Sequence, residues 1–365
     1  MTQANLRVHI RQLCCLGLPS EQLVPPLLKA VRQLVGADSA GFFWVDSRGD
    51  MTSLYAERLL PPSVMRLYFE RYYESDESSF RRSFTERLRQ NETVAAMSPS
   101  RALQRTPYYN EVFRRLDAHH VLYGIVRDHG QAIGQLSLYR ARTAQAFSPA
   151  QRAELTAIMR YVTHGIAQHG RPGVDSQDFL DTDDDAVFLI GADAGIRQIS
   201  LNSQKLLTLA TQGRIGPQHS LTIDDHALRP MLLRLAQGLR TILSGGEGGP
   251  PSLVLQNPWG RFVLRAYAVG DGPLDADANI AIRIQRQETK ILKFVDALNG
   301  LELSPRQRDV AVGLARGASN RDLAATMGVS INTVAYHVKQ LFERLDSHDR
   351  QHMIAKVLCT GTRQA

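Results

Sequence analysis

The feature that most constrains this chain is a series of helix-start and helix-stop signals between residues 303 and 345. Three serines suit N-cap positions and two glycines suit the helix ends between them: Ser304, Ser319, Ser330, Gly317 and Gly328. Pro305 and Gln307 follow the first serine as in a capping box with proline in the first turn. Asp322 stands three residues after the second serine. The spacing predicts short helices joined by tight glycine turns, the helix-turn-helix arrangement.

The last of these helices, in the stretch VSINTVAYHVKQL (329–341), has two different faces. At helical spacing four apolar residues lie on one side: Val334, Val338, Leu341 and Leu345. Asn332, Tyr336, Lys339 and Glu343 lie opposite. In a helix-turn-helix unit the second helix enters the DNA major groove, so this polar face is predicted to contact DNA. Plain solvation of the face is the alternative.

The motifs themselves resemble the LuxR/NarL-type DNA-binding domain. The pattern L-[ST]-P-R-[EQ]-R-[ED]-V is present at 303–310 and G-x-S-N-[KR]-[ED]-[IL]-A at 317–324. The pattern [IV]-S-x-x-T-V-x-x-H follows at 329–337. The resemblance covers nearly all of 301–358 and implies a four-helix domain, which we place at 301–365.

The resemblance also implies roles for single residues. Asn320, Arg321 and Thr333 match family positions near the DNA backbone, where contacts set register without reading sequence. Lys339 is expected to reach a phosphate or a guanine edge, and Tyr336 a thymine methyl group or a phosphate.

Asn332 and Ala335 complete the predicted DNA-binding set. The family often has Lys or Arg where this chain has Ala335, and a small aliphatic residue where it has Tyr336. This departure puts the family's usual operator preference in doubt. His337, at the edge of the apolar face, is expected to pack or cap, with pH sensing or base reading as the alternative.

Charge and composition agree with an anionic partner. The 365 residues carry a formal charge of +7, and 301–365 hold three more basic than acidic residues. Such an excess favours nucleic acid or an acidic membrane surface. Three cysteines are too few for a disulfide framework or a zinc cluster, and no cofactor or metal is predicted. Without a signal peptide or a run of about 20 apolar residues, we expect a cytoplasmic protein that does not enter membranes.

Residues 1–170 predict an α+β domain of antiparallel hairpins and helices. Hairpin turns are expected at 47–50 and 128–130, with a helical, aromatic region over 64–89 between them. Ser148 and Gln151 predict a capped closing helix, whose inward stripe would be Leu155, Ile158, Met159, Val162 and Ile166. The ending RDHGQAIGQLSLYRARTAQAFSPAQRAEL resembles a GAF domain, a likeness that covers about 20–168.

A second α+β domain is predicted at 178–287. The Gly/Pro/Asp-rich stretch 170–185 is expected to be a linker, with Asp183, Asp184 and Asp185 solvated. AVFLIGADAGIRQIS then predicts two strands, and Asn202 is expected to cap the next helix. These features resemble the opening of a PAS domain. The stretches 252–269 and 279–285 predict three further strands.

Residues 286–300 predict an amphipathic linker helix, assigned to 288–300 between the second domain and the C-terminal one. Its apolar stripe is Ile291, Leu292, Val295 and Leu298. Pairing with its copy in a homodimer and packing on the PAS-like domain are left open as two alternatives. The fold class is therefore multidomain, with two α+β sensory domains and an all-α helix-turn-helix domain.

The prediction is a one-component transcriptional regulator that binds double-stranded DNA as a homodimer and responds to an unidentified signal, for which a small-molecule effector is one candidate. Tyr68, Tyr72 and Tyr73 are candidates for an effector pocket, with core packing as the alternative. No nucleophile–base arrangement or P-loop is present, so no enzyme activity is expected.

Two other functions stay open. In one, the chain is an acyl-homoserine-lactone receptor, because LYFERYYESDESSF resembles the aromatic-then-Asp run of those proteins. No proline follows the acid, however, and the sensory part is over 100 residues longer than theirs. In the other, the chain is a protein-interaction sensor that does not bind DNA. The sequence names neither the signal, the target genes nor the direction of regulation.

Overall fold

The computed structural model describes residues 2–58, 62–73, 93–167, 178–191, 193–216, 225–247, 249–270 and 279–362. These residues form two compact units that do not follow chain order. Unit 1 comprises 1–34, 160–180 and 288–365, and unit 2 comprises 35–159 and 181–287. The domain boundaries expected at 170, 178, 288 and 301 stay predictions. Part of the helical region expected over 64–89 and of the linker at 170–185 lies outside the described residues.

Unit 2 contains a first antiparallel sheet with the strand order β2-β1-β5-β4-β3. Its strands are β1 (Ser39–Val45), β2 (Met51–Ala56), β3 (Val94–Met97), β4 (His120–Asp128) and β5 (Gln131–Arg140). The hairpins predicted around 47–50 and 128–130 are confirmed, since β1 pairs with β2 and β4 with β5. Among the described residues between β2 and β4, four short helical segments accompany β3: α3 (Pro62–Leu67), η1 (Tyr68–Tyr72), η2 (Leu103–Arg105) and η3 (Tyr109–Phe113).

Helix α5 (Pro149–Ala167) closes the first α+β region with the predicted cap. The Ser148 Oγ accepts from the Gln151 amide at 3.3 Å, and the Gln151 Oε1 accepts from the Ser148 amide at 3.0 Å. All five residues of the predicted inward stripe are buried. Gly124 in β4 leaves room for Met159, whose sulfur would lie 2.5 Å from an added Cβ. A side chain at that position would therefore push α5 off the sheet.

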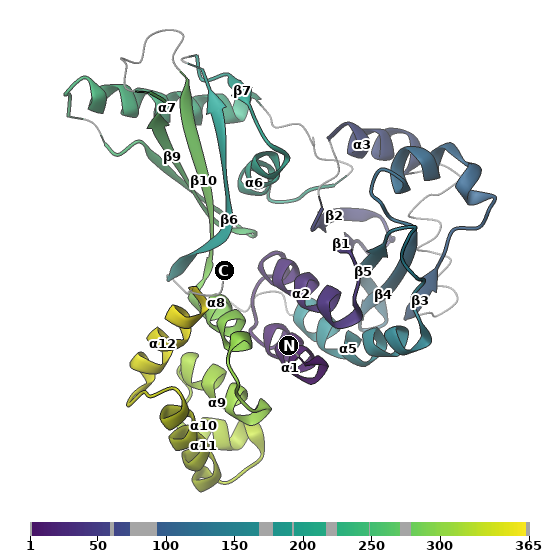
Figure 1. Ribbon diagram of the computed structural model, residues 1–365, viewed down its shortest axis with the longest axis vertical. Helices are drawn as coiled ribbons and strands as arrows, with labels where there is room; N and C mark the ends of the chain where they lie inside the picture. Colours follow the sequence, from purple (N-terminus) through teal and green to yellow (C-terminus); the bar gives the residue numbers. More distant parts are fainter. Residues whose placement is uncertain are drawn as a thin grey trace. The chain divides into compact units, whose positions relative to one another are not determined.

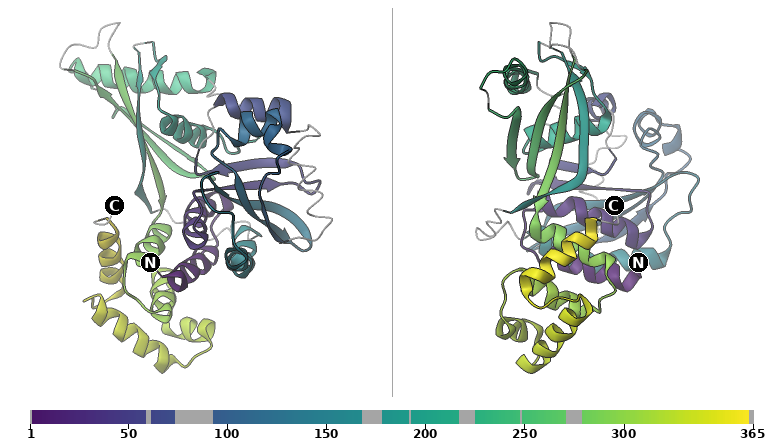
Figure 2. Two further views of the ribbon diagram at one scale, coloured as in Figure 1. Left: turned by 45° about the vertical axis from the view of Figure 1, so that its right-hand side comes forward. Right: turned by 60° about the vertical axis from the view of Figure 1, so that its left-hand side comes forward.

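A second antiparallel sheet in unit 2 has the order β7-β6-β10-β9-β8, the same order as the first (Figure 1). Its strands are β6 (Phe179–Ile190), β7 (Ile196–Gln198), β8 (Ser252–Asn257), β9 (Gly260–Ala268) and β10 (Ile280–Thr289). Helices α6 (Leu201–Thr211) and α7 (Asp225–Leu243) pack against β8 and β9 (Figure 2). The sheet's buried residues include Phe188, Phe262, Leu264, Ile282 and Ile284. The predicted fold class, antiparallel α+β domains followed by helices, is confirmed.

The acidic run in this sheet was predicted wrongly as a linker, although Asp183 is exposed to solvent as predicted. Asp183, Asp184 and Asp185 lie inside β6. Arginines of β10 pair with two of them, Arg283 with Asp185 at 2.7 Å and Arg286 with Asp184 at 3.3 Å. Cross-strand ion pairs let a strand carry consecutive carboxylates that composition alone assigns to a linker.

The cap of α6 also differs from the prediction. Ser200, not Asn202, is the N-cap, because its hydroxyl accepts from the Ser203 amide. Asn202 lies inside the first turn and donates to the Asp185 carbonyl at 3.1 Å.

Unit 1 is helical. Besides residues 160–167 of α5, its described helices are α1 (Gln3–Cys14), α2 (Ser20–Val35, reaching one residue beyond the unit), α8 (Lys290–Ala297), α9 (Pro305–Ala315), α10 (Asn320–Met327), α11 (Ile331–Arg344) and α12 (Arg350–Thr362). A 3-10 turn, η4 (Leu298–Gly300), follows α8. The linker helix begins at Lys290 because β10 continues to Thr289.

The apolar stripe of α8 is covered inside unit 1. Leu292, Val295 and Leu298 are at most 1% exposed, and α8 packs against α1, α9 and α12. Three of the four predicted stripe residues therefore pack inside unit 1, whereas Ile291 is half-buried, and pairing of α8 with its copy stays a prediction. None of the described helices is long and apolar enough to span a membrane.

Candidate nucleic-acid interface

The predicted capping signals fix the starts of α9, α10 and α11. Ser304 with Gln307 and Ser319 with Asp322 each form a complete capping box. Ser330 accepts from the Thr333 amide at 3.1 Å and so starts α11. The hydrogen bonds from Ser319 hold the pKa of Asp322 below its usual value, so this cap is ionised at neutral pH.

The turn between α10 and α11 depends on Gly328. Its φ of 62° is left-handed, a conformation that costs a residue with a Cβ about 1–2 kcal/mol. Val334 and Leu341, from the predicted inner face of α11, are fully buried. Val338 and Leu345 are half-buried. The helix pair is therefore the helix-turn-helix that the sequence predicts.

The opposite face of α11 is open to solvent. Asn332, Ala335, Tyr336 and Lys339 are all exposed, and the Tyr336 side chain reaches 57%. Tyr336 supplies a flat ring with a hydroxyl at its tip.

Interactions within the face are few and weak. The Gln340 Nε2 donates to the Tyr336 hydroxyl at 2.7 Å, which orients the ring one helical turn away. The Lys339 ammonium lies 3.8 Å from Glu343, and both side chains are more than half exposed. Such a pair contributes only about 0.3–0.5 kcal/mol, so Lys339 exchanges Glu343 for a stronger anion at little cost.

Residues of α10 join this face in part. A shallow hollow is lined by Asn320 at the start of α10 together with Ala335 and Lys339 of α11. Arg321 is exposed on α10 but does not line that hollow. Thr333 is half-buried, and its hydroxyl lies 2.8 Å from that of Ser330, so it also takes part in the cap.

His337 lies at the edge of the face, half-buried. Its ring centroid is 5.8 Å from that of Tyr336. Among the described residues, its buried Nδ1 has no hydrogen-bond partner.

Two charged residues at the start of α9 were not assigned a role from the sequence. Arg308 is 1% exposed and donates to the carbonyls of Leu298 at 2.8 Å and Leu303 at 3.1 Å, and to that of Leu301 at 2.7 Å. The guanidinium thus satisfies the carbonyls at the end of α8 and in the segment that leads to α9. The R-[EQ]-R-[ED] pattern in the sequence includes Arg308, but it does not indicate which groups the side chain binds.

Asp309, the next residue, binds the first helix of the chain. The Arg11 Nη2 donates to both carboxylate oxygens, at 2.6 and 2.8 Å, and the Gln12 Nε2 donates to one of them at 3.0 Å. The Arg316 guanidinium donates to the Cys15 carbonyl at 3.0 Å. We call these hydrogen bonds the α1–α9 contact.

A buried histidine lies beside this contact. His9 of α1 is 2% exposed, and burial together with the positive charges of Arg308 and Lys29 lowers its pKa to about 3. Asp296 lies 3.7 Å away, but its side chain is half exposed and screened by water. His9 is therefore neutral at physiological pH.

The tyrosines predicted for an effector pocket lie in or beside η1. Tyr68 lines a cavity on the first sheet. Tyr72 donates to Glu111 at 2.6 Å, and the Tyr73 hydroxyl accepts from the Met51 amide at 2.7 Å. Neither of these two is among the described lining residues. The described part of the chain contains no group of three or more His, Cys, Asp or Glu side chains placed to bind a metal ion.

Known proteins similar to this chain include two curated regulators. The tetrathionate response regulatory protein TtrR of Salmonella typhimurium is 22% identical over 134 residues, 37% of this chain and 64% of that protein. The probable transcriptional regulatory protein SgaR of Hyphomicrobium methylovorum is 40% identical over 53 residues, 14% of this chain and 25% of that protein. The matches thus span less than two thirds of either relative.

Solved structures with similarity to this chain include GAF domains. The GAF domain/HD domain protein from Geobacter sulfurreducens matches 40% of this chain and 89% of its own, with 22% identity and a TM-score of 0.30. The cyanobacteriochrome TePixJ GAF domain matches 43% of this chain and 91% of its own, with 16% identity and a TM-score of 0.31.

A family model matches the helices described above. It is that of the bacterial regulatory proteins of the luxR family, and it covers residues 301–357, from the segment before α9 into α12. The motifs, the capped helices and this match agree on the same residues. Residues 301–357 therefore form a helix-turn-helix domain of the luxR family of bacterial regulatory proteins.

Proposed function

We propose that this protein is a DNA-binding transcriptional regulator whose DNA affinity responds to a signal received by the α+β domains. Double-stranded DNA contacts the exposed face of α11 and the start of α10. The contacting residues are Asn320, Arg321, Asn332, Thr333, Ala335, Tyr336 and Lys339. A DNA-binding role would be carried out in the cytoplasm, the location that we propose for this protein.

The observation that supports this proposal best is the open face of α11. Its polar side chains are exposed on a helix whose apolar residues Val334 and Leu341 are fully buried, so the face is rigidly presented. Lys339 is held by one weak ion pair. A helix that presents such a face as the second of a helix-turn-helix fits the major groove.

The α1–α9 contact is our proposed route for the signal. Asp309 belongs to the first helix of the luxR-type domain, and Arg11 and Gln12 belong to the N-terminal helix. The contact leaves Tyr336 and Lys339 exposed. We propose that the signal alters how α1 holds α9, which shifts the population of DNA-competent arrangements.

We further propose that two copies bind one operator, with half-sites about one helical turn apart in a near-palindromic sequence. Leu292 and Val295 of the α8 stripe are already buried within unit 1 and are therefore not available to a dimer interface.

A charge reversal tests DNA binding directly. The full chain is titrated against a random-sequence duplex by fluorescence anisotropy, with Lys339→Glu as the test variant. Arg265→Glu, which reverses one exposed charge in β9, is the matched control. We expect Lys339→Glu to lose at least tenfold in affinity and the control to keep wild-type affinity. Absence of DNA binding by the wild-type chain would favour a protein-interaction module instead.

A further inference from the structure

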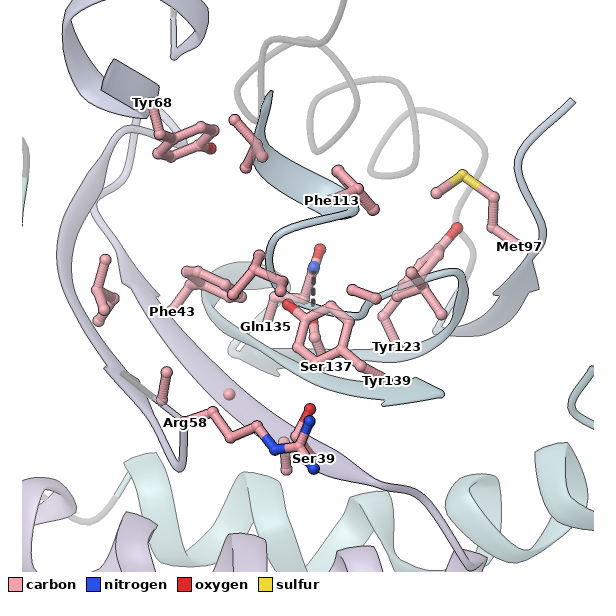
Figure 3. Close-up of a pocket in the computed structure, with 18 of the residues that line it drawn as sticks. Ser39, Phe43, Arg58, Tyr68, Met97, Phe113, Tyr123, Gln135, Ser137 and Tyr139 are labelled. Atoms are coloured by element: carbon pink, nitrogen blue, oxygen red, sulfur yellow. Dashed lines mark hydrogen bonds between the residues drawn. The ribbon is translucent and has the colours of Figure 1, made fainter. Parts of the chain in front are cut away.

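A cavity of about 230 Å³ lies between the first sheet and the short helical segments that connect β2 to β4 (Figure 3). Strands β1, β4 and β5 form its floor, while α3, η1 and η3 supply its opposite wall. The described residues that line it include six aromatic rings: Phe43, Tyr68, Tyr108, Phe113, Tyr123 and Tyr139. Every described residue that lines it belongs to unit 2.

The strand register explains why the floor is open. Ser137 in the central strand β5 pairs with Gly41 on one side and with Tyr123 on the other. Because Gly41 has no side chain, space remains above Ser137 that a larger residue would fill. The ring of Tyr139, two residues along β5 on the same face, borders this space.

Two buried polar groups stand on this aromatic floor. Gln135 is 5% exposed and Ser137 is 1% exposed, and the Gln135 Nε2 donates to the Ser137 Oγ at 2.9 Å. Because the Ser137 oxygen accepts this bond, its own O–H proton can be donated to a further acceptor. The pair offers a directional hydrogen bond from neutral groups.

The surroundings disfavour charge inside the cavity. Burial, reinforced by neighbouring tyrosines, raises the pKa of Tyr68 well above its usual value, so this phenol is neutral at any physiological pH. Arg58 is the charged side chain among the described lining residues, and it is exposed. Burying an ion costs several kcal/mol unless a buried group of opposite charge pairs with it, so these walls favour an uncharged occupant.

Size limits the occupant further. A dry cavity of about 150 Å³ holds benzene, so 230 Å³ accommodates roughly ten non-hydrogen atoms. Aromatic walls favour a flat ring, which packs edge-on or offset against tyrosine and phenylalanine.

We propose that this cavity binds a small uncharged aromatic molecule, of the size of indole or a substituted phenol, with an acceptor or hydroxyl group against Ser137. This inference rests on the proposed function, since it names the class of signal to which the regulator responds. It extends the pocket predicted around Tyr68 to the floor of the sheet.

Calorimetric titration of the full chain without DNA tests the proposal. The probes are phenol and indole, with benzoate and benzylamine as charged molecules of similar size. We expect saturable one-to-one binding of a neutral probe, and at least tenfold weaker binding of both charged ones. Absence of saturable binding by phenol and indole, or equal binding of benzoate or benzylamine, would overturn the proposal.

Two variants locate the bound probe. Ser137→Ala should weaken phenol binding about tenfold, and Ala56→Leu, which places a larger side chain against the cavity, should abolish it. Thermal melts establish that both variants fold, and Gln135→Met replaces Ser137→Ala if that variant does not. Unchanged affinity in the folded variants would place the ligand elsewhere. Because the calorimetric titration contains no DNA, its result is independent of the DNA-binding experiment, so a failure of the ligand proposal can be told from a failure of the proposed function.

Discussion

Lys339 and Arg321 are two exposed cations of one domain, and we expect them to contact different parts of the DNA. Lys339 lies on the outer face of α11, among residues that would face base edges if this helix enters the major groove as we propose. Arg321 lies on α10, the helix that crosses the DNA backbone in this arrangement. Lys339 is therefore expected to discriminate between DNA sequences, and Arg321 to fix the position of the domain on the DNA backbone.

Lys339→Ala should therefore weaken operator binding by roughly 1–3 kcal/mol and relax the sequence preference at one base pair. Arg321→Ala should lower affinity for all sequences alike. Selection of preferred duplexes from a random pool, carried out for the wild type and both variants, measures the preference. A uniform loss for Lys339→Ala would instead assign this lysine to a phosphate.

Arg308 carries a structural role inside the same domain. Its guanidinium binds three backbone carbonyls around the start of α9 while almost fully buried. Arg308→Ala removes the side-chain donor to all three carbonyls, of which those of Leu298 and Leu301 still accept a backbone N–H, and should reduce the free energy of unfolding by about 1–3 kcal/mol. Arg308→Lys should recover only part of the lost free energy of unfolding, because an ammonium group cannot reproduce the planar, forked arrangement of donors in the guanidinium. Urea unfolding measures both, and equal losses for the two would contradict the fork argument.

The residues that the sequence predicts well are those whose partners are close in the chain. Ser304, Ser319 and Ser330 cap helices through contacts three residues away, so local pattern suffices. Asp309 is different, because its partners Arg11 and Gln12 are almost 300 positions distant. No local signal in a single sequence connects such residues.

Among the elements, helix α1 connects the N-terminal part of the chain to the luxR-type domain through hydrogen bonds from Arg11 and Gln12 to Asp309. Arg11 and Asp309 form a two-oxygen ion pair that is partly shielded from water. A double-mutant cycle with Arg11→Ala and Asp309→Ala should give a coupling energy of about 1–2 kcal/mol in urea unfolding. Additive losses would show that the pair contributes no stability of its own.

The elements predicted wrongly share one cause. Asp183 to Asp185 look like a linker, yet arginines of β10 neutralise two of these carboxylates across the strands. The linker helix starts at Lys290 because β10 continues to Thr289, paired with β9 as far as Gln287, and the Lys290 amide then donates to the Asp178 carbonyl at 2.9 Å. In both places strand pairing outweighs local propensity. Hydrophobic periodicity and composition contain no information on such pairing, so neither predicts it. The hairpins at 47–50 and 128–130 are predictable because their turns are local.

For the whole molecule, stability should depend on pH through His9. Its pKa is about 3 in the folded chain, against about 6.5 in an unfolded one, so the unfolded state binds more protons between these values. The free energy of unfolding should thus be fully present above pH 6.5. It should fall by about 1.4 kcal/mol per pH unit as the pH drops below 6.5 towards 3.

Urea unfolding at pH 7.5, 6.5 and 5.5 measures this dependence, with His9→Gln as the comparison because glutamine does not titrate. The difference between wild type and variant isolates His9 from the other histidines. A difference that stays constant across the three pH values would show that His9 is not held neutral by burial.

The account as a whole requires that the luxR-type domain binds DNA through α10 and α11 in the full chain. The most direct measurement is the salt dependence of binding to a random-sequence duplex for the wild type, Arg321→Ala and the β9 control Arg265→Ala. We predict that log K falls linearly with log salt, and that Arg321→Ala lowers the slope by about one while Arg265→Ala leaves it unchanged. Binding without salt dependence, or identical slopes for all three proteins, would contradict it.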